Sequence, residues 1–208
     1  MHRRTALSVS AALLVAAPLL SACSSAEVRP GTAAVVGGER ITTAALQAQV
    51  KDVRTAQSRA DQPERLIAAS AGLERVKLGK MIQLRVLEKA AEDAGVSVST
   101  KDIEAARKAQ TEQAKGAAQL ETAALMDRVP LAPDQIDGEF RFRLLFGKLS
   151  DRYGEDKVLD ALGKAAKELH IQVNPRYGAW DDKQIGLGNA ETPWVNQRTR
   201  AEQAPAGA

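Results

Sequence analysis

The first apolar stretch of the chain is short and follows a pair of arginines. Residues 11–20 are small or aliphatic and include Pro18, while Arg3 and Arg4 stand just before this region. A helix that spans a membrane needs roughly twenty apolar residues, so a run of ten is too short. The pattern therefore predicts a removable export signal over residues 1–22 and not a transmembrane anchor.

Two short β-prone runs lie near the opposite ends of the remaining chain. Residues 33–36 (AAVV) precede Gly37 and Gly38, which permit a turn. Residues 170–173 (HIQV) stop before Pro175, which cannot donate to a β-ladder. A lone strand leaves backbone donors and acceptors unpaired. We therefore expect the two runs to pair, which would bring the two ends of the domain together.

Between these runs, apolar residues recur at the spacing of amphipathic helices. Thr42 is a suitable N-cap for the first helix, and Gly72 and Gly79 can each bend or divide the long apolar segment that follows. The predicted helices cover residues 44–58, 63–95, 102–118, 120–126, 133–149 and 155–169. The expected fold class is mainly α, with a short N-terminal strand that pairs with a short C-terminal strand.

The predicted segments differ in how much surface they can bury. Residues 102–118 contain one large aliphatic side chain, Ile103, so we expect a solvated arm there. Residues 63–95 carry an apolar face so wide that it needs more than one packing neighbour, and residues 133–149 carry two apolar stripes. Residues 181–208 are rich in glycine, asparagine and glutamine, so we expect an irregular or disordered tail.

The end of the export signal carries a second motif. Residues 20–23 (LSAC) resemble the lipobox of bacterial lipoproteins and end at Cys23, the only cysteine. By that resemblance, Cys23 is the lipid-attachment site: its sulfur receives a diacylglyceryl group, and a polar tether over residues 23–31 follows from the new N-terminus. Such a lipid anchors a protein at the membrane. The alternatives are an ordinary secretory signal with an incidental cysteine, and twin-arginine export through Arg3 and Arg4.

The residue composition limits the kinds of binding and catalysis that we expect of the chain. Removal of Arg3 and Arg4 from the 29 basic residues leaves 27 against 26 acidic ones, so charge gives no reason to expect nucleic-acid binding. An acylated Cys23 leaves no thiol for a disulfide, a nucleophile or a metal site. The remaining histidine, His170, is more typical of a surface or packing residue than of a catalyst. We therefore expect no enzymatic activity, no cofactor and no metal.

Four segments, in their order along the chain, resemble the N-terminal chaperone module of SurA- and PrsA-like extracytoplasmic foldases. They are residues 36–42 (VGGERIT), 84–100 (LRVLEKAAEDAGVSVST), 131–149 (LAPDQIDGEFRFRLLFGKL) and 171–181 (IQVNPRYGAWD). They are similar, in turn, to a strand-to-helix signature, a helix that ends in a glycine, a later amphipathic helix, and the closing strand of lipoprotein members from actinomycete bacteria. The resemblance implies a SurA N-terminal-like helical domain over residues 32–180.

Foldases of this family often carry a parvulin prolyl isomerase domain between the late helix and the last strand. Here residues 150–169 have the pattern of a single helix, so the resemblance implies a chaperone without isomerase activity. Its expected partners are the membrane, through the lipid, and unfolded or partly folded exported polypeptides. Its expected location is the outer face of the cytoplasmic membrane of a Gram-positive bacterium. The alternative is a structural or adaptor lipoprotein that binds one defined envelope partner; the oligomeric state stays open.

Large apolar side chains beyond the needs of a core are the candidates for contact with clients, because an apolar surface suits unfolded chains. An ordinary core position is the other interpretation of each. The candidate client-contact residues are Met81, Phe140, Phe142, Leu145 and Phe146.

Overall fold

The computed structural model describes residues 30–189. The predicted export signal, the lipobox with Cys23, most of the tether and the tail beyond residue 189 lie outside the described residues. In chain order the elements are β1 (Thr32–Val36), β2 (Glu39–Thr42), α1 (Thr43–Ser58), α2 (Pro63–Ala69), α3 (Leu73–Asp93), α4 (Thr100–Gln113), α5 (Ala117–Leu125), the 3₁₀ turn η1 (Pro133–Gln135), α6 (Ile136–Tyr153), α7 (Glu155–Glu168), β3 (Gln172–Val173), the 3₁₀ turn η2 (Pro175–Tyr177), β4 (Ala179–Asp181) and β5 (Gly186–Gly188). The prediction of a mainly α fold is confirmed.

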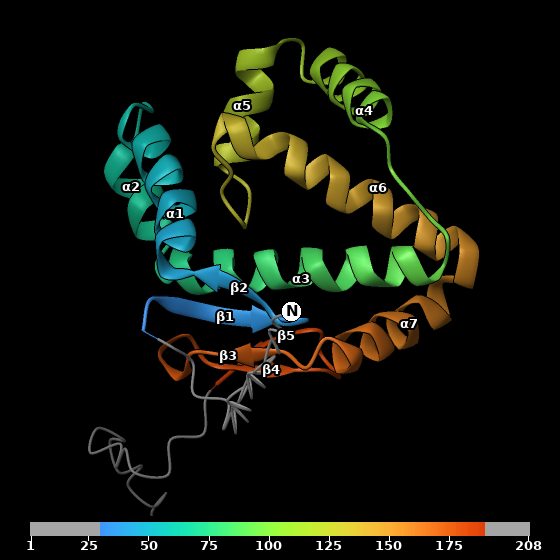
Figure 1. The fold of residues 1–208 in the computed structure, drawn as a ribbon. Helices are drawn as coiled ribbons and strands as arrows, with labels where there is room; N and C mark the ends of the chain where they lie inside the picture. The colour runs from blue at the N-terminus through green and yellow to red at the C-terminus, as the bar shows by residue number, and fades with distance from the viewer. Residues whose placement is uncertain (1–29, 190–208) are drawn as a thin grey trace, which may run out of the picture.

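The N-terminal and C-terminal strands meet as the sequence predicts. β1 and β3 are antiparallel, with Ala34 opposite Val173 and Val35 opposite Gln172. Beyond β3, the backbone N–H of Asn174 donates to the carbonyl of Ala33 at 2.9 Å. The first strand and the strand that follows the last helix therefore share one small sheet, which lies on one side of the helical body (Figure 1).

β1 also has a partner that the sequence pattern does not predict. β2 pairs with the other edge of β1, so the strand order is β2-β1-β3. Gly37 and Gly38 form the two-residue turn with φ of 58° and 80°, and such turns require positive φ at both positions. Gly37 also lies against α7: a Cβ there would stand 2.7 Å from the Leu169 side chain.

α3 crosses the middle of the molecule and organises the rest (Figure 1). The sheet and α7 lie on one side of it, while α1 with α2, and α4 with α5 and α6, rise on the other side as two arms. One face of α3 enters the main core, where Leu78, Ile82 and Val86 are fully buried together with Leu46 and Leu149. The core therefore lies between α3 and the sheet, α6 and α7.

The two glycines in the long predicted helix behave differently. The helix divides at Gly72, which has φ of 74° and stands just before α3. Gly79 stays within α3, and its open side accepts the Leu187 side chain of β5, whose Cδ1 lies 3.7 Å from the position of an added Cβ. The predicted solvated arm is α4, which has no buried side chain; Ile103 and Ala106 are its partly buried residues toward α6.

The expectation of an irregular chain from residue 181 is wrong for the described part of that tail. β4 and β5 form a hairpin, with Trp180 opposite Leu187. Side chains of α3 hold it: Arg75 donates to the Leu187 carbonyl at 2.9 Å, and Gln83 donates to the Ile185 carbonyl at 2.8 Å. The apolar residues in the described part of the tail thus pack on the core. Side chains of α3 supply hydrogen-bond donors to backbone carbonyls of the glycine-rich hairpin. Within residues 30–189, no helix has the length and apolarity needed to cross a bilayer.

Candidate functional site

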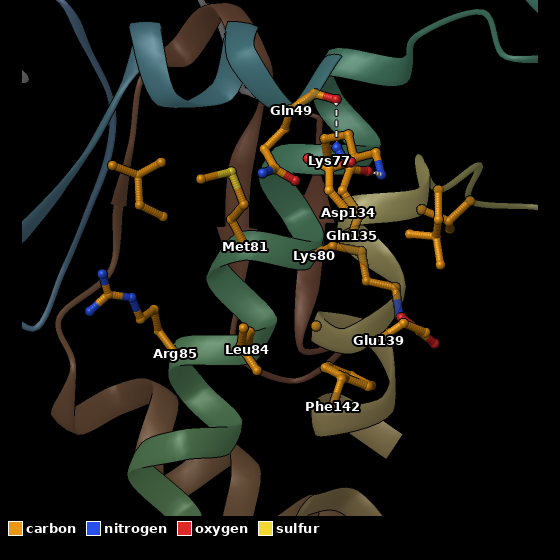
Figure 2. A pocket seen from close by; sticks show the side chains of 14 residues that line it. Gln49, Lys77, Lys80, Met81, Leu84, Arg85, Asp134, Gln135, Glu139 and Phe142 are labelled. Atoms are coloured by element: carbon orange, nitrogen blue, oxygen red, sulfur yellow. Dashed lines mark hydrogen bonds and ion pairs between the residues drawn. The ribbon is translucent and has the colours of Figure 1, made fainter. Parts of the chain in front are cut away.

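A groove opens along one face of α3, between the two arms and next to β2. Its volume is about 360 Å³, and its walls come from α1, β2, α6 and the segment between α5 and α6. Figure 2 shows α3 at the centre, with Met81 and Leu84 projecting from it and Phe142 on the neighbouring α6. The lining residues are Ile41, Gln49, Lys77, Lys80, Met81, Leu84, Arg85, Val129, Leu131, Asp134, Gln135, Gly138, Glu139 and Phe142.

The spacing of the residues on α3 explains the floor of the groove. Lys77, Lys80, Met81, Leu84 and Arg85 are three, four, seven and eight positions apart, so they lie on one face of the helix. Met81 and Leu84 are partly exposed there. The sequence pattern shows an apolar surface wider than one neighbour covers, and the groove is the part of that surface that no described element covers.

Lys80 links the floor to the α6 wall. Its ammonium nitrogen lies 4.1 Å from the centroid of the Phe142 ring and 3.5 Å from Oε2 of Glu139. A cation over an aromatic face is attracted by the ring quadrupole, and the carboxylate adds an ion pair. The two contacts hold the Phe142 ring at the groove while its surface stays partly exposed.

A buried series of hydrogen bonds fixes one end of the groove. Lys77, only 4% exposed, donates to Oε1 of Gln135 at 2.6 Å, and Nε2 of Gln135 donates to the Gln49 carbonyl at 2.9 Å. Burial lowers the pKa of Lys77 from its usual 10.5 to about 8, against the opposing attraction of Glu139 and Asp134. These hydrogen bonds connect α1, α3 and η1, so they set the distance between the two arms at this point (Figure 2).

The structure separates the five candidate client-contact residues. Met81 and Phe142 line the groove. Phe146 is 37% exposed but is not among the residues that line this groove.

The assignment of Phe140 and Leu145 as client-contact residues is corrected, because both side chains are buried in the interior. Phe140 is 7% exposed and packs with Leu120 and Ile136, and Leu145 is 2% exposed in the main core. Neither side chain lines the groove on α3. Their role is to attach α6 to its neighbours, which positions Phe142 at the groove.

Sequence analysis missed other apolar residues of the groove. Leu84 stands at helical spacing from Met81, so the periodicity of α3 could have identified it. Ile41 comes from β2, and Val129 and Leu131 come from the segment between α5 and α6. No local signal marks these three, because only the tertiary structure brings them to α3.

Metal ions in proteins are held by groupings of His, Cys, Asp and Glu side chains. No cluster of three or more His, Cys, Asp or Glu side chains with metal-binding geometry occurs among residues 30–189. His170 is exposed and lies between α7 and β3, where its Nδ1 is 2.7 Å from the Glu168 carbonyl. The arrangement at α3 is that of a binding module with an apolar floor and charged margins.

Comparison with known families assigns this module. The family described as the SurA-like N-terminal domain matches residues 2–126, and the chain belongs to that family. The match covers the elements from β1 to α5, so it includes the groove floor on α3 but not the α6 wall. No curated protein and no solved structure matches the chain. SurA-like N-terminal domains are chaperone modules and not catalytic domains, which gives this chain a chaperone-like, extracytoplasmic role related to protein folding.

Proposed function

We propose that the protein is a membrane-anchored holdase that binds unfolded exported polypeptides in the groove on α3. The observation that carries the proposal is an open cavity of about 360 Å³ with apolar side chains at its floor and walls. Ligand sites are usually concave and mostly apolar, and uncovered apolar surface marks interaction sites. The apolar lining comes from Ile41, Met81, Leu84, Val129, Leu131 and Phe142.

The charged margins of the groove favour weak and reversible binding. Lys80, Arg85 and Glu139 stand among the apolar lining residues and are each engaged in an ion pair, Arg85 with Glu39 of β2. A client that covers these pairs must remove water from them, which offsets part of the gain from apolar contact. Binding of this kind permits release without nucleotide hydrolysis.

The location of the described chain ends supports an anchor at Cys23. β1 and β5, the first and last described elements, both lie on the sheet side of α3, while the two arms rise on its opposite side (Figure 1). The tether over residues 23–31 can extend by roughly 3.3–3.6 Å per residue, about 30 Å in all. A lipid at Cys23 would therefore hold the sheet side of the molecule toward the membrane. The groove would then stay open to polypeptides that emerge from the membrane.

Light scattering tests the holdase proposal. Several unrelated denatured proteins are diluted into buffer with the mature chain (Cys23→Ser, residues 23–208) at near-stoichiometric concentration, with serum albumin as the control for crowding. We expect suppression of aggregation for most clients, because apolar contact does not depend on a defined sequence. Suppression for none of them contradicts the proposal and leaves the adaptor with one defined partner as the function.

Cell fractionation tests the anchor separately. The wild-type chain is expected in the membrane fraction, and Cys23→Ser is expected in the soluble extracytoplasmic fraction, because two acyl chains are needed for stable anchoring. A Ser25→Ala variant serves as the matched control and stays with the membrane. Cys23→Ser protein that remains at the membrane to the same extent as the wild type contradicts the lipid assignment.

A further inference from the structure

β2 is an edge strand whose outer side has no strand partner among residues 30–189. The order β2-β1-β3 places β1 on one side of β2 only. Edge strands present backbone N–H and C=O groups that can pair with another chain. The outer edge of β2 therefore offers hydrogen-bonding groups at the margin of the groove.

The hydrogen bonds of β1 identify which groups of β2 are free. Ala33 accepts from Asn174 on the β3 side, and backbone groups alternate in direction along a strand, so Val35 also faces β3. Arg40 stands opposite Val35 and so receives no bond from it. The N–H and C=O of Arg40 consequently point away from the sheet, and no described residue bonds to either.

The free edge is continuous with the groove. Ile41, next to Arg40, turns its side chain inward and lines the groove. Glu39, on the other side of Arg40, forms an ion pair with Arg85 on the groove floor. The Arg40 side chain itself lies on the opposite, outer face, where its Nε donates to Thr32 Oγ1 at 2.8 Å.

We propose that the groove binds its client as an extended segment that adds antiparallel to the outer edge of β2. This proposal rests on the proposed function and specifies the conformation and pattern of the client. One client residue, x, would exchange two backbone hydrogen bonds with Arg40. Its two neighbours then point toward the groove, because side chains alternate along a strand. The one before x stands opposite Ile41, on the side of Met81 and Leu84, and the one after x stands opposite Glu39, which is paired with Arg85.

The geometry therefore selects an extended client segment with an apolar side chain at the residue before x, opposite Ile41. Residue x lies on the outer face beside the Arg40 guanidinium, so a polar or acidic side chain is favoured there over a basic one. A helical client would place its backbone groups in internal hydrogen bonds and leave Arg40 unpaired. A one-residue shift of register would turn this apolar side chain outward, so its position also fixes the register.

Amide hydrogen exchange at Arg40, measured by NMR on the mature chain with Cys23→Ser, tests this directly. The probe is a nine-residue peptide of alternating valine and threonine. The control peptide has the same sequence with every threonine N-methylated, so that residue x has no backbone N–H to donate to the Arg40 carbonyl. We expect the unmethylated peptide to bind about tenfold more tightly and to slow exchange of the Arg40 amide at least tenfold. The Val35 amide, which already bonds within the sheet, serves as the internal reference.

A pair of variants gives a second measurement. Arg40→Pro removes the free N–H, and proline is tolerated on an edge strand where that group faces solvent; Arg40→Ala removes the side chain and keeps the N–H. We expect Arg40→Pro, shown to be folded by circular dichroism, to bind the alternating peptide about tenfold more weakly than Arg40→Ala. If Arg40→Pro does not fold, the exchange measurement on the unaltered chain decides.

The outcomes distinguish the two proposals. Peptide binding without slowed exchange at Arg40, or with equal affinity in the two variants, overturns strand addition and leaves the holdase function in place. Absence of binding for every peptide, together with no suppression of aggregation, overturns both.

Discussion

The two faces of α3 carry similar apolar residues but meet different surroundings. Leu78, Ile82 and Val86 on one face are fully buried against the core. Met81 and Leu84 on the other face stay partly exposed, because α1 and α6 rise on either side without covering them. The buried face holds the fold together, and the open face is available for a ligand. Apolar residues on one face of α3 therefore stabilise the fold, and we propose that those on the other face bind clients.

The largest effect is expected from the buried face. Ile82→Ala removes a fully buried side chain and should lower the free energy of unfolding by about 3–4 kcal/mol, from lost apolar contact and a residual cavity. Urea denaturation measures this loss. Client affinity of the molecules that remain folded should not change; a large loss of affinity at full folding would contradict the separation of the two faces.

A somewhat smaller effect is expected at Lys77, where the two faces meet. Its pKa is about 8 when folded and near 10.5 when unfolded, so between these values the unfolded state binds more protons. Stability should therefore rise from pH 8 to pH 10.5, by up to about 3 kcal/mol from this residue. Lys77→Met, compared with the wild type by chemical denaturation across that range, should lack the increment; identical pH profiles would show that Lys77 is not desolvated.

The smallest effect on stability is expected from the open face. Met81→Ala, next to Ile82, should lower the free energy of unfolding by less than about 1 kcal/mol, because its side chain is partly exposed and alanine favours the helix. Client affinity should fall roughly threefold to tenfold. A Met81→Ala variant as unstable as Ile82→Ala would place Met81 in the core instead.

Sequence patterns predicted the parts of the fold that local chemistry determines. The chain has few β-prone runs, so the pairing of residues 33–36 with residues 170–173 could be inferred. β2 was missed because Ile41 is the one large apolar residue in its four positions. The β4–β5 hairpin was missed because isolated apolar residues between glycines resemble a tail until α3 supplies partners for their backbone.

The candidate site was predicted only in part, for a geometric reason. Phe140 and Phe142 are two positions apart on α6, so they point to nearly opposite sides of the helix. Nothing in the sequence tells which side faces α5 and which faces the groove. Gly72 and Gly79 show the same limit, since Gly72 is the N-cap of α3 and Gly79 makes room for Leu187. Both distinctions depend on neighbours that are distant in sequence.

A matched pair of variants on α6 tests the central claim most directly. Phe142→Ser and Phe146→Ser make the same change one turn apart, on residues inside and outside the groove. Affinity for a fluorescently labelled unfolded client should fall at least fivefold in Phe142→Ser and stay within twofold of the wild type in Phe146→Ser, with both variants folded. Equal affinities for the two variants, or a greater loss in Phe146→Ser, would show that clients do not bind in the groove on α3.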